Sequence, residues 1–356
     1  FSVTQNDWGE YCQCEECRKI QQKYTRDGEP SLSAPIALAV NSVAKEIAKW
    51  QKTDERVKNR KIFIETFAYN YTRTAPKGIK IEDNVIIRFC AKGDRLHKFS
   101  ENFAINNKLI KDFENWKSIA ENVFVWEYMA NACMPISYNT FMRVMPERFK
   151  YFSEQNIVGM FAQYEAYGAI GPLFKANQYV FAKLLWNPDI DYAKEYNEFM
   201  DYYFREAAPY LKEVQRRFEE NMLSVDEKRK EENGLGLYLE AAFMMLPEYY
   251  PQEFLDVADS LYKVALSKVK TAELKLRVRK EYWYVKFARM YVRRGKDYEE
   301  MQKVLDEMDE LEISFDKISF FKEHYYGGKK DDLFLTSIED RNRRQDEELL
   351  LDVNRG

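Results

Sequence analysis

Three acidic residues stand where segments rich in β-branched and aromatic residues end. They are Asp7, Glu127 and Glu165, and a fourth, Glu65, lies in the middle of such a segment and is a weaker candidate. Carboxyl groups that converge on one pocket can act as proton donor and as nucleophile or base, the pair of roles that glycosidic bond cleavage needs. We therefore predict Asp7, Glu127 and Glu165 as catalytic residues, with a structural hydrogen-bonding role as the alternative for each.

Aromatic and amide side chains crowd the ends of the same segments. Aromatic rings offer flat apolar faces with a polar tip, which suits contact with sugar rings. Large aromatics also fill the interior of barrels, so packing is the alternative for any one of them. The candidate substrate-binding residues are Asn6, Trp8, Tyr69, Tyr71, Trp126, Tyr128, Gln163 and Tyr164.

Three cysteines lie close together in the sequence at Cys12, Cys14 and Cys17. A structural zinc site would need a fourth ligand, for which Cys90 is a candidate. One disulfide with a free thiol, or three reduced thiols, are equally open interpretations. In each case the cluster would hold the loop that carries Asp7. We expect no cofactor for the chemistry itself.

Composition excludes several classes of function. The 55 basic and 59 acidic residues nearly cancel to a net charge of −4, which does not resemble a nucleic-acid-binding footprint. Apolar stretches are too short and too interrupted to predict a membrane span. The two histidines, His97 and His324, lie in no catalytic motif. The oligomeric state cannot be read from these features.

The elements that must position these residues alternate between strand and helix patterns. Such alternation predicts βαβ units with a parallel sheet. The predicted strands are 1–5, 61–71, 84–91, 122–128 and 157–164. The predicted helices are 35–51, 104–120, 141–154 and 174–186.

The first predicted strand has nothing before it to pair with, and the turn after it lacks the glycines of a dinucleotide-binding fold. We therefore predict strands four to eight of a (β/α)8 TIM-type barrel, and we expect the polypeptide to extend further upstream. Active sites of such barrels lie at the carboxyl ends of the strands. This is where the candidate residues cluster.

Three regions are predicted along the chain. Residues 1–190 would form the C-terminal part of the barrel, 191–326 an all-α helical bundle domain, and 327–356 a polar tail. Within the bundle we predict one or two helices over 193–223, a charged connector at 224–233 and a helix at 235–246. Further helices are predicted at 251–269, 272–294 and 298–311.

The chain resembles a bacterial family known as domain of unknown function 4838. The likeness covers about residues 1–210, where several motifs follow one another in the family's order. They are FSVTQNDWGEYCQCEECRKI (1–20), FIETFAYNYTRTAPK (63–77), NVIIRFCA (84–91), NVFVWEYMAN (122–131), NIVGMFAQYEAYG (156–168) and AKLLWNPDID (182–191). The family is similar to glycoside hydrolases of family 163 and distantly to families 20 and 67. This resemblance implies a barrel and a secreted, periplasmic or cell-surface location in a bacterium.

The resemblance also assigns roles to individual residues. Asn6 and Asp7 match the family's N-D pair, at the strand where many retaining barrel enzymes hold their acid. Glu127 stands where such enzymes hold a nucleophile and where relatives carry Asp. Relatives read Glu-Gln-Gly where this chain has Ala162, Gln163 and Tyr164.

We therefore predict a glycoside hydrolase that acts on complex glycans, including those with N-acetylhexosamine. A non-catalytic glycan-binding protein on a degenerate barrel is the alternative, and a structural protein whose helical domain binds a partner is a third hypothesis. The expected partner is a carbohydrate substrate, with no nucleic acid.

Overall fold

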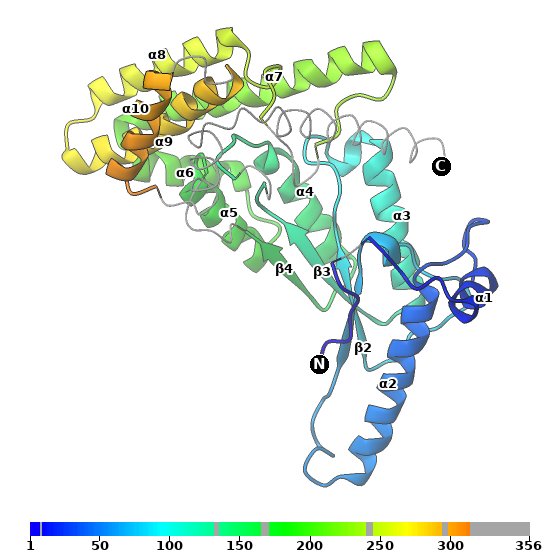
Figure 1. The fold of residues 1–356 in the computed structure, drawn as a ribbon. Coiled ribbons are helices and arrows are strands. Elements are labelled where there is room, and N and C mark those ends of the chain that lie inside the picture. The colour runs from blue at the N-terminus through cyan, green and yellow to red at the C-terminus, as the bar shows by residue number, and fades with distance from the viewer. Residues whose placement is uncertain (8, 132–134, 165–170, 240–244, 294–297, 314–356) are drawn as a thin grey trace. The chain divides into compact units, whose positions relative to one another are not determined.

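The chain folds into two compact units that interleave along the sequence. A computed structural model describes residues 1–7, 9–131, 135–164, 171–239, 245–293 and 298–313 (Figure 1). The first unit, here called the sheet unit, is Phe1–Lys92, Asn106–Tyr128 and Tyr151–Gln163. The second, the helical unit, is Gly93–Ile105, Met129–Lys150 and Tyr164–Gly356.

The sheet unit is built on a parallel sheet whose strands follow one another in chain order. They are β1 (Ile64–Ala68), β2 (Val85–Cys90), β3 (Asn122–Tyr128) and β4 (Gly159–Gln163). Each strand pairs in parallel with the one that precedes it in the sequence. The predicted mixed α/β fold with a parallel sheet is confirmed. A closed barrel is not shown by the part of the chain that the structure describes.

The first residues of the chain lie along the outer edge of β1. The Val3 amide donates to the Glu65 carbonyl at 2.8 Å, and the Glu65 amide donates to the Phe1 carbonyl at 2.7 Å. The bridge between Ser2 and Glu65 is parallel. The segment predicted as the first strand therefore extends the sheet in the expected order.

Helices cover one face of this sheet. Helix α2 (Ala34–Thr53) has Pro in its first turn, where the missing amide costs nothing, and contacts β1 and β2. In α3 (Ala104–Ile119), the Phe113 ring meets Phe89 of β2 edge-on at 5.4 Å. Phe113 also contacts Phe152 near the end of α4 (Phe141–Glu154), at 5.1 Å.

Alternation along the strands separates this covered face from a second one. Val85, Ile87, Phe89, Val123 and Val125 are fully buried and share the covered face. The half-buried or exposed residues between them define what we call the aromatic face. It consists of Glu65, Phe67, Arg88, Phe124, Trp126, Tyr128, Phe161 and Gln163.

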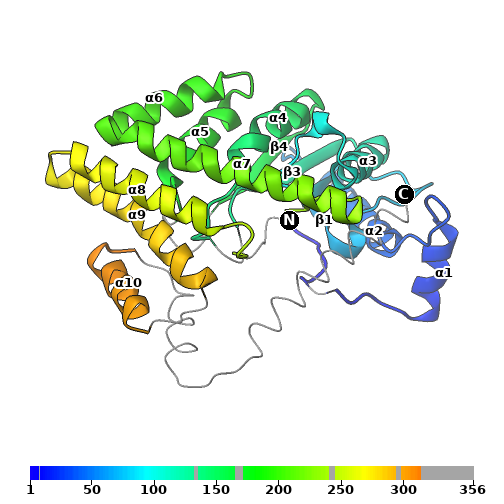
Figure 2. The same cartoon turned by 90° about the horizontal axis from the view of Figure 1, so that it is seen from above.

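The helical unit contains a series of helices in which sequence neighbours pack against one another (Figure 2). After α5 (Phe174–Trp186) and α6 (Tyr192–Phe204) comes the long α7 (Ala208–Asn233), and the remaining helices are α8 (Gln252–Lys268), α9 (Ala272–Val292) and α10 (Tyr298–Glu310). Short 3-10 turns lie at Asn70–Thr72, Phe99–Glu101 and Arg205–Ala207, and α1 (Glu15–Lys23) belongs to the sheet unit. The predicted helical C-terminal region is confirmed. Among the described helices, none combines the length and the apolar character needed to cross a membrane.

Two predicted boundaries in the helical unit are wrong. The region 224–233 is not a connector, because α7 continues through it to Asn233 with Lys230 and Asp226 paired one turn apart. The described residues of the predicted helix 235–246 are not helical. Gly234 and Gly236 both have positive φ, which ends α7 and turns the chain away from a helical path.

Candidate functional site

Asp7 lies at the carboxyl end of the sheet, near the hydroxyl of Tyr69. The Lys92 ammonium lies 5.8 Å from the centre of the Tyr69 ring. Burial raises the pKa of the Tyr69 hydroxyl, the Lys92 charge opposes this, and the neighbouring Asp7 carboxylate raises the pKa further. The Asp7 side chain itself is exposed to solvent.

Gln5 anchors the segment that carries Asp7. Its side-chain amide donates to the Tyr69 carbonyl at 3.1 Å and to the Thr72 hydroxyl at 2.7 Å. Thr72 in turn caps the turn after β1 by accepting from the Tyr69 amide at 3.1 Å. The end of the first strand and the end of β1 are therefore held together by side chains as well as by sheet pairing.

Trp126 and Gln163 form a second polar contact on the aromatic face. The Trp126 indole Nε1 donates to Gln163 Oε1 at 2.9 Å across β3 and β4. The Trp126 ring contacts Phe67 at 5.7 Å and Phe161 at 4.7 Å, both edge-on. Its neighbours hold the indole in place, and the indole fixes the orientation of the Gln163 amide.

Tyr128 and Cys90 lie on this face at the carboxyl ends of β3 and β2. The two side chains lie close together, and burial raises the pKa of the Cys90 thiol to about 12. Burial also raises the pKa of Tyr128 well above its usual range, with Cys90 and Tyr69 as further causes. A buried neutral thiol of this kind is a packing group with little nucleophilic character.

An ion pair lies further down the same face. Arg88 pairs with Glu65, and its guanidinium lies 5.0 Å from the ring centre of Phe124 and 5.6 Å from that of Trp126. Arg88 was not predicted as a site residue, because it lies within β2 and the candidates were residues at strand ends. The period-two pattern of β2 could have revealed it, since Arg88 alternates with fully apolar residues.

Glu127 does not join Asp7 on this face. Alternation along β3 puts it on the covered face with Val123 and Val125, fully buried, and its carboxylate accepts from the Tyr128 amide at 2.9 Å. In register it pairs with Ala162 of β4. The sequence pattern Val-x-Val-x-Glu already indicates that Glu127 shares a face with the two valines, because every second residue of a strand points to the same side. The catalytic role of Glu127 stays a prediction.

The other predicted residues have separate surroundings. Asn6 is exposed beside Asp7, and the Tyr71 ring lies 5.6 Å from Tyr11. Tyr164 belongs to the helical unit and contacts Phe174 of α5 at 4.8 Å. Trp8 and Glu165, both predicted to take part in the site, lie outside the described residues, as do Cys133 and His324.

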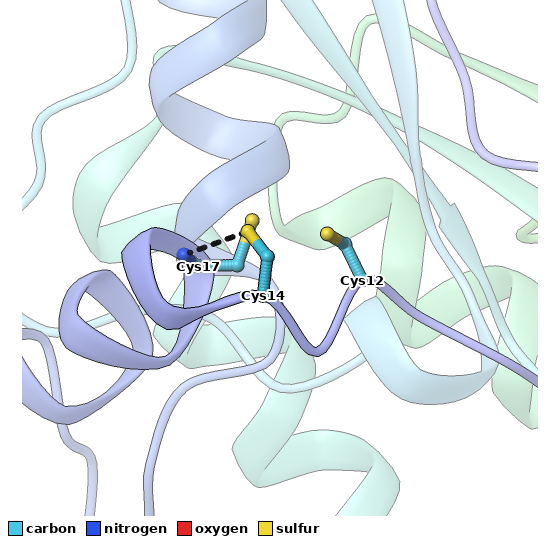
Figure 3. A group of neighbouring side chains, drawn as sticks. All are labelled: Cys12, Cys14 and Cys17. Atoms are coloured by element: carbon cyan, nitrogen blue, oxygen red, sulfur yellow. Dashed lines mark hydrogen bonds between the residues drawn. The ribbon is translucent and has the colours of Figure 1, made fainter.

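Cys12, Cys14 and Cys17 are brought together as a group that could hold a metal ion (Figure 3). Cys90, considered as a fourth ligand, is not part of the group and lies buried on β2 instead. All four of these cysteines are free thiols in the structure. The disulfide interpretation is therefore not the state observed.

A histidine that the sequence left without a role is central to the helical unit. His97 Nδ1 lies 2.9 Å from Asp94 Oδ2, and its Nε2 lies 3.1 Å from Asp226 Oδ2. Burial alone would lower the pKa of His97, but hydrogen bonds to the two carboxylates raise it to about 9. The imidazole also stacks on Phe103 at 4.0 Å and lines a cavity of about 620 Å³. Asp94 lies three residues before His97 in the sequence, but Asp226 belongs to the distant helix α7, so no local motif could show the complete network.

These features define a mixed α/β protein with a parallel sheet, a polar and aromatic strand-end site and a helical C-terminal region. The sequence pattern of the family described as domain of unknown function (DUF4838) matches residues 1–215. The chain therefore belongs to this family. No curated protein and no solved structure matches the chain significantly.

Proposed function

We propose that this protein is a glycoside hydrolase that holds a complex glycan against the aromatic face and uses Asp7 as its acid. The observation that carries the proposal is the exposed Asp7 carboxylate near Tyr69, at the carboxyl end of a parallel sheet on which Tyr128 lies close to Tyr69. An exposed carboxyl next to aromatic rings can reach the glycosidic oxygen of a sugar that stacks there. A carbohydrate is the partner that this surface suits.

We also propose that β1–β4 are four consecutive strands of a (β/α)8 barrel, with the segment at Phe1–Val3 as the strand before them. Two observations support this. Every pairing is parallel, and each strand lies beside its predecessor in the chain, which is the order of barrel strands. In a barrel the helices lie outside, so the aromatic face would be the interior.

In this mechanism Asp7 donates a proton to the departing oxygen, and the Tyr69 hydroxyl then stabilises the carboxylate that is left. The second role of glycosidic cleavage can come from a second carboxylate or, for N-acetylhexosamine substrates, from the substrate's own acetamido group. The Gln163 amide, oriented by Trp126, is placed on the face where it could contact a sugar.

A non-catalytic glycan-binding protein is the second candidate. It is favoured by the position of Glu127 on the covered face and by the pairing of Glu65 with Arg88, which leaves Asp7 as the unpaired carboxylate at the described strand ends. Ala162 does not bear on the choice. It pairs in register with Glu127 and so belongs to the covered face.

The test uses the full-length protein with a panel of N-glycans and mucin oligosaccharides, following product by mass spectrometry and binding by calorimetry. We expect Asp7→Asn to lose about 100- to 10,000-fold in kcat with binding retained, as for loss of a general acid. Glu10→Gln, which changes an exposed carboxylate of the same segment, is the control and should keep full activity. Binding without product from the unaltered protein would favour the second candidate, and neither binding nor product would reject both.

A further inference from the structure

Three thiols converge at the start of α1 without being buried. The Sγ atoms of Cys12, Cys14 and Cys17 all lie within 4.8 Å of one another. Figure 3 shows the Cys12 sulfur pointing toward the other two, which lie together at the first turn of the helix. Cys12 and Cys14 are exposed and Cys17 is partly exposed, so burial of an apolar side chain does not explain the convergence.

The spacing of the sulfurs suits a shared cation. Tetrahedral zinc with Zn–S bonds of about 2.3 Å places two sulfurs roughly 3.8 Å apart, so the group needs to contract by no more than about 1 Å. A disulfide would need two of the sulfurs at about 2.0 Å and would leave the third thiol without a role.

The start of α1 already positions one of the three sulfurs. Cys14 is the N-cap of α1, and its sulfur accepts from the Cys17 amide at 3.5 Å. A cation bound to all three sulfurs would offset the repulsion between three neighbouring thiolates.

We propose that Cys12, Cys14 and Cys17 bind one zinc ion through three thiolates, with the fourth position open to water or an added ligand. Zinc accepts thiolate ligands in tetrahedral geometry, and three protein ligands with one open position is a common arrangement. Binding would cross-link residues 12–17 and so restrain the segment between Gln5, which is anchored to the turn after β1, and helix α1. This inference does not depend on the proposed function.

Metal content and cobalt spectroscopy of the full-length protein test the proposal. The protein is reduced, supplied with zinc, dialysed and analysed for metal, with cobalt(II) as a probe of ligand type. We expect one zinc per chain, release of that zinc when thiols are alkylated, and thiolate-to-cobalt charge-transfer bands with tetrahedral d–d bands. Cys12→Ser and Cys14→Ser should each lose stoichiometric zinc and the charge-transfer bands.

Cys90→Ala is the matched control, because this thiol lies apart from the group, and it should keep one zinc per chain. Circular dichroism of each variant separates loss of the site from loss of the fold. Substoichiometric zinc in the reduced and folded protein would overturn the proposal. So would iron with inorganic sulfide after anaerobic purification, or a stable disulfide between Cys14 and Cys17 with no metal after its reduction.

Discussion

The charged network at His97 makes the stability of the helical unit depend on pH in a predictable direction. The pKa of His97 is about 9 in the folded protein, against 6.5 for an unperturbed histidine. A folded pKa above the unfolded one means that the stabilisation is complete below pH 6.5 and is lost as the pH rises through about 9. At about 1.4 kcal/mol for each pH unit, the difference of 2.5 units corresponds to at most about 3.5 kcal/mol.

The perturbation is His97→Gln, which keeps a hydrogen-bonding side chain but removes the charge between Asp94 and Asp226. We expect the variant to be less stable than the unaltered protein by up to about 3.5 kcal/mol at pH 6, with the difference shrinking toward pH 9.5. The free energy of unfolding is measured by urea titration, followed by circular dichroism, at half-unit intervals of pH. Groups that do not interact with His97 titrate alike in both proteins and cancel in the difference.

Asp226→Asn and the double variant complete a mutant cycle. If the ion pair carries the effect, the two single changes should not add, and the coupling should fade over the same pH range. Free energies of unfolding for the unaltered protein and His97→Gln that run parallel from pH 6 to pH 9.5 would refute the reasoning, because the imidazole would then have the same pKa in both states.

Two further predictions concern the helical unit. In urea titration, Gly236→Ala should lower the free energy of unfolding by clearly more than Gly234→Ala does. Both glycines have a positive φ, which costs a residue with a side chain about 1 kcal/mol. Only at Gly236 would the added carbon also meet a neighbour, Asp226 Oδ1 at 2.5 Å. Equal losses would show that the contact relaxes freely. Burial raises the pKa of Glu281 from 4.5 to about 8, so its ionisation destabilises the folded protein increasingly above pH 4.5. Glu281→Gln, whose amide oxygen can still accept from the Leu173 amide, should therefore raise the free energy of unfolding by up to about 4 kcal/mol at pH 8 and by little at pH 4. A gain that is the same at both pH values would contradict this cause.

The local sequence pattern predicted the bounds of several helices and strands closely. The bounds of α4, α5 and β3 match the predicted ranges to the residue, because each segment carries a strong apolar period of its own. The order of strands and helices also indicated the parallel sheet, since consecutive βα units leave few other pairings. The run 224–233 was misread because charged residues were taken as a break, whereas pairs spaced four apart support a helix.

The grouping of side chains was decided by the tertiary structure. Trp126 and Glu127 are neighbours in the sequence, yet they lie on opposite faces of β3, and only the packing of helices shows which face is covered. The charged network at His97 depends on Asp226, which only the tertiary structure brings beside the imidazole. The grouping of the three thiols depends little on tertiary structure, because the start of helix α1 sets the spacing of Cys12, Cys14 and Cys17. Sequence thus determined contacts made within a turn or a strand, while contacts between distant segments depend on how whole elements pack, which local periodicity does not encode.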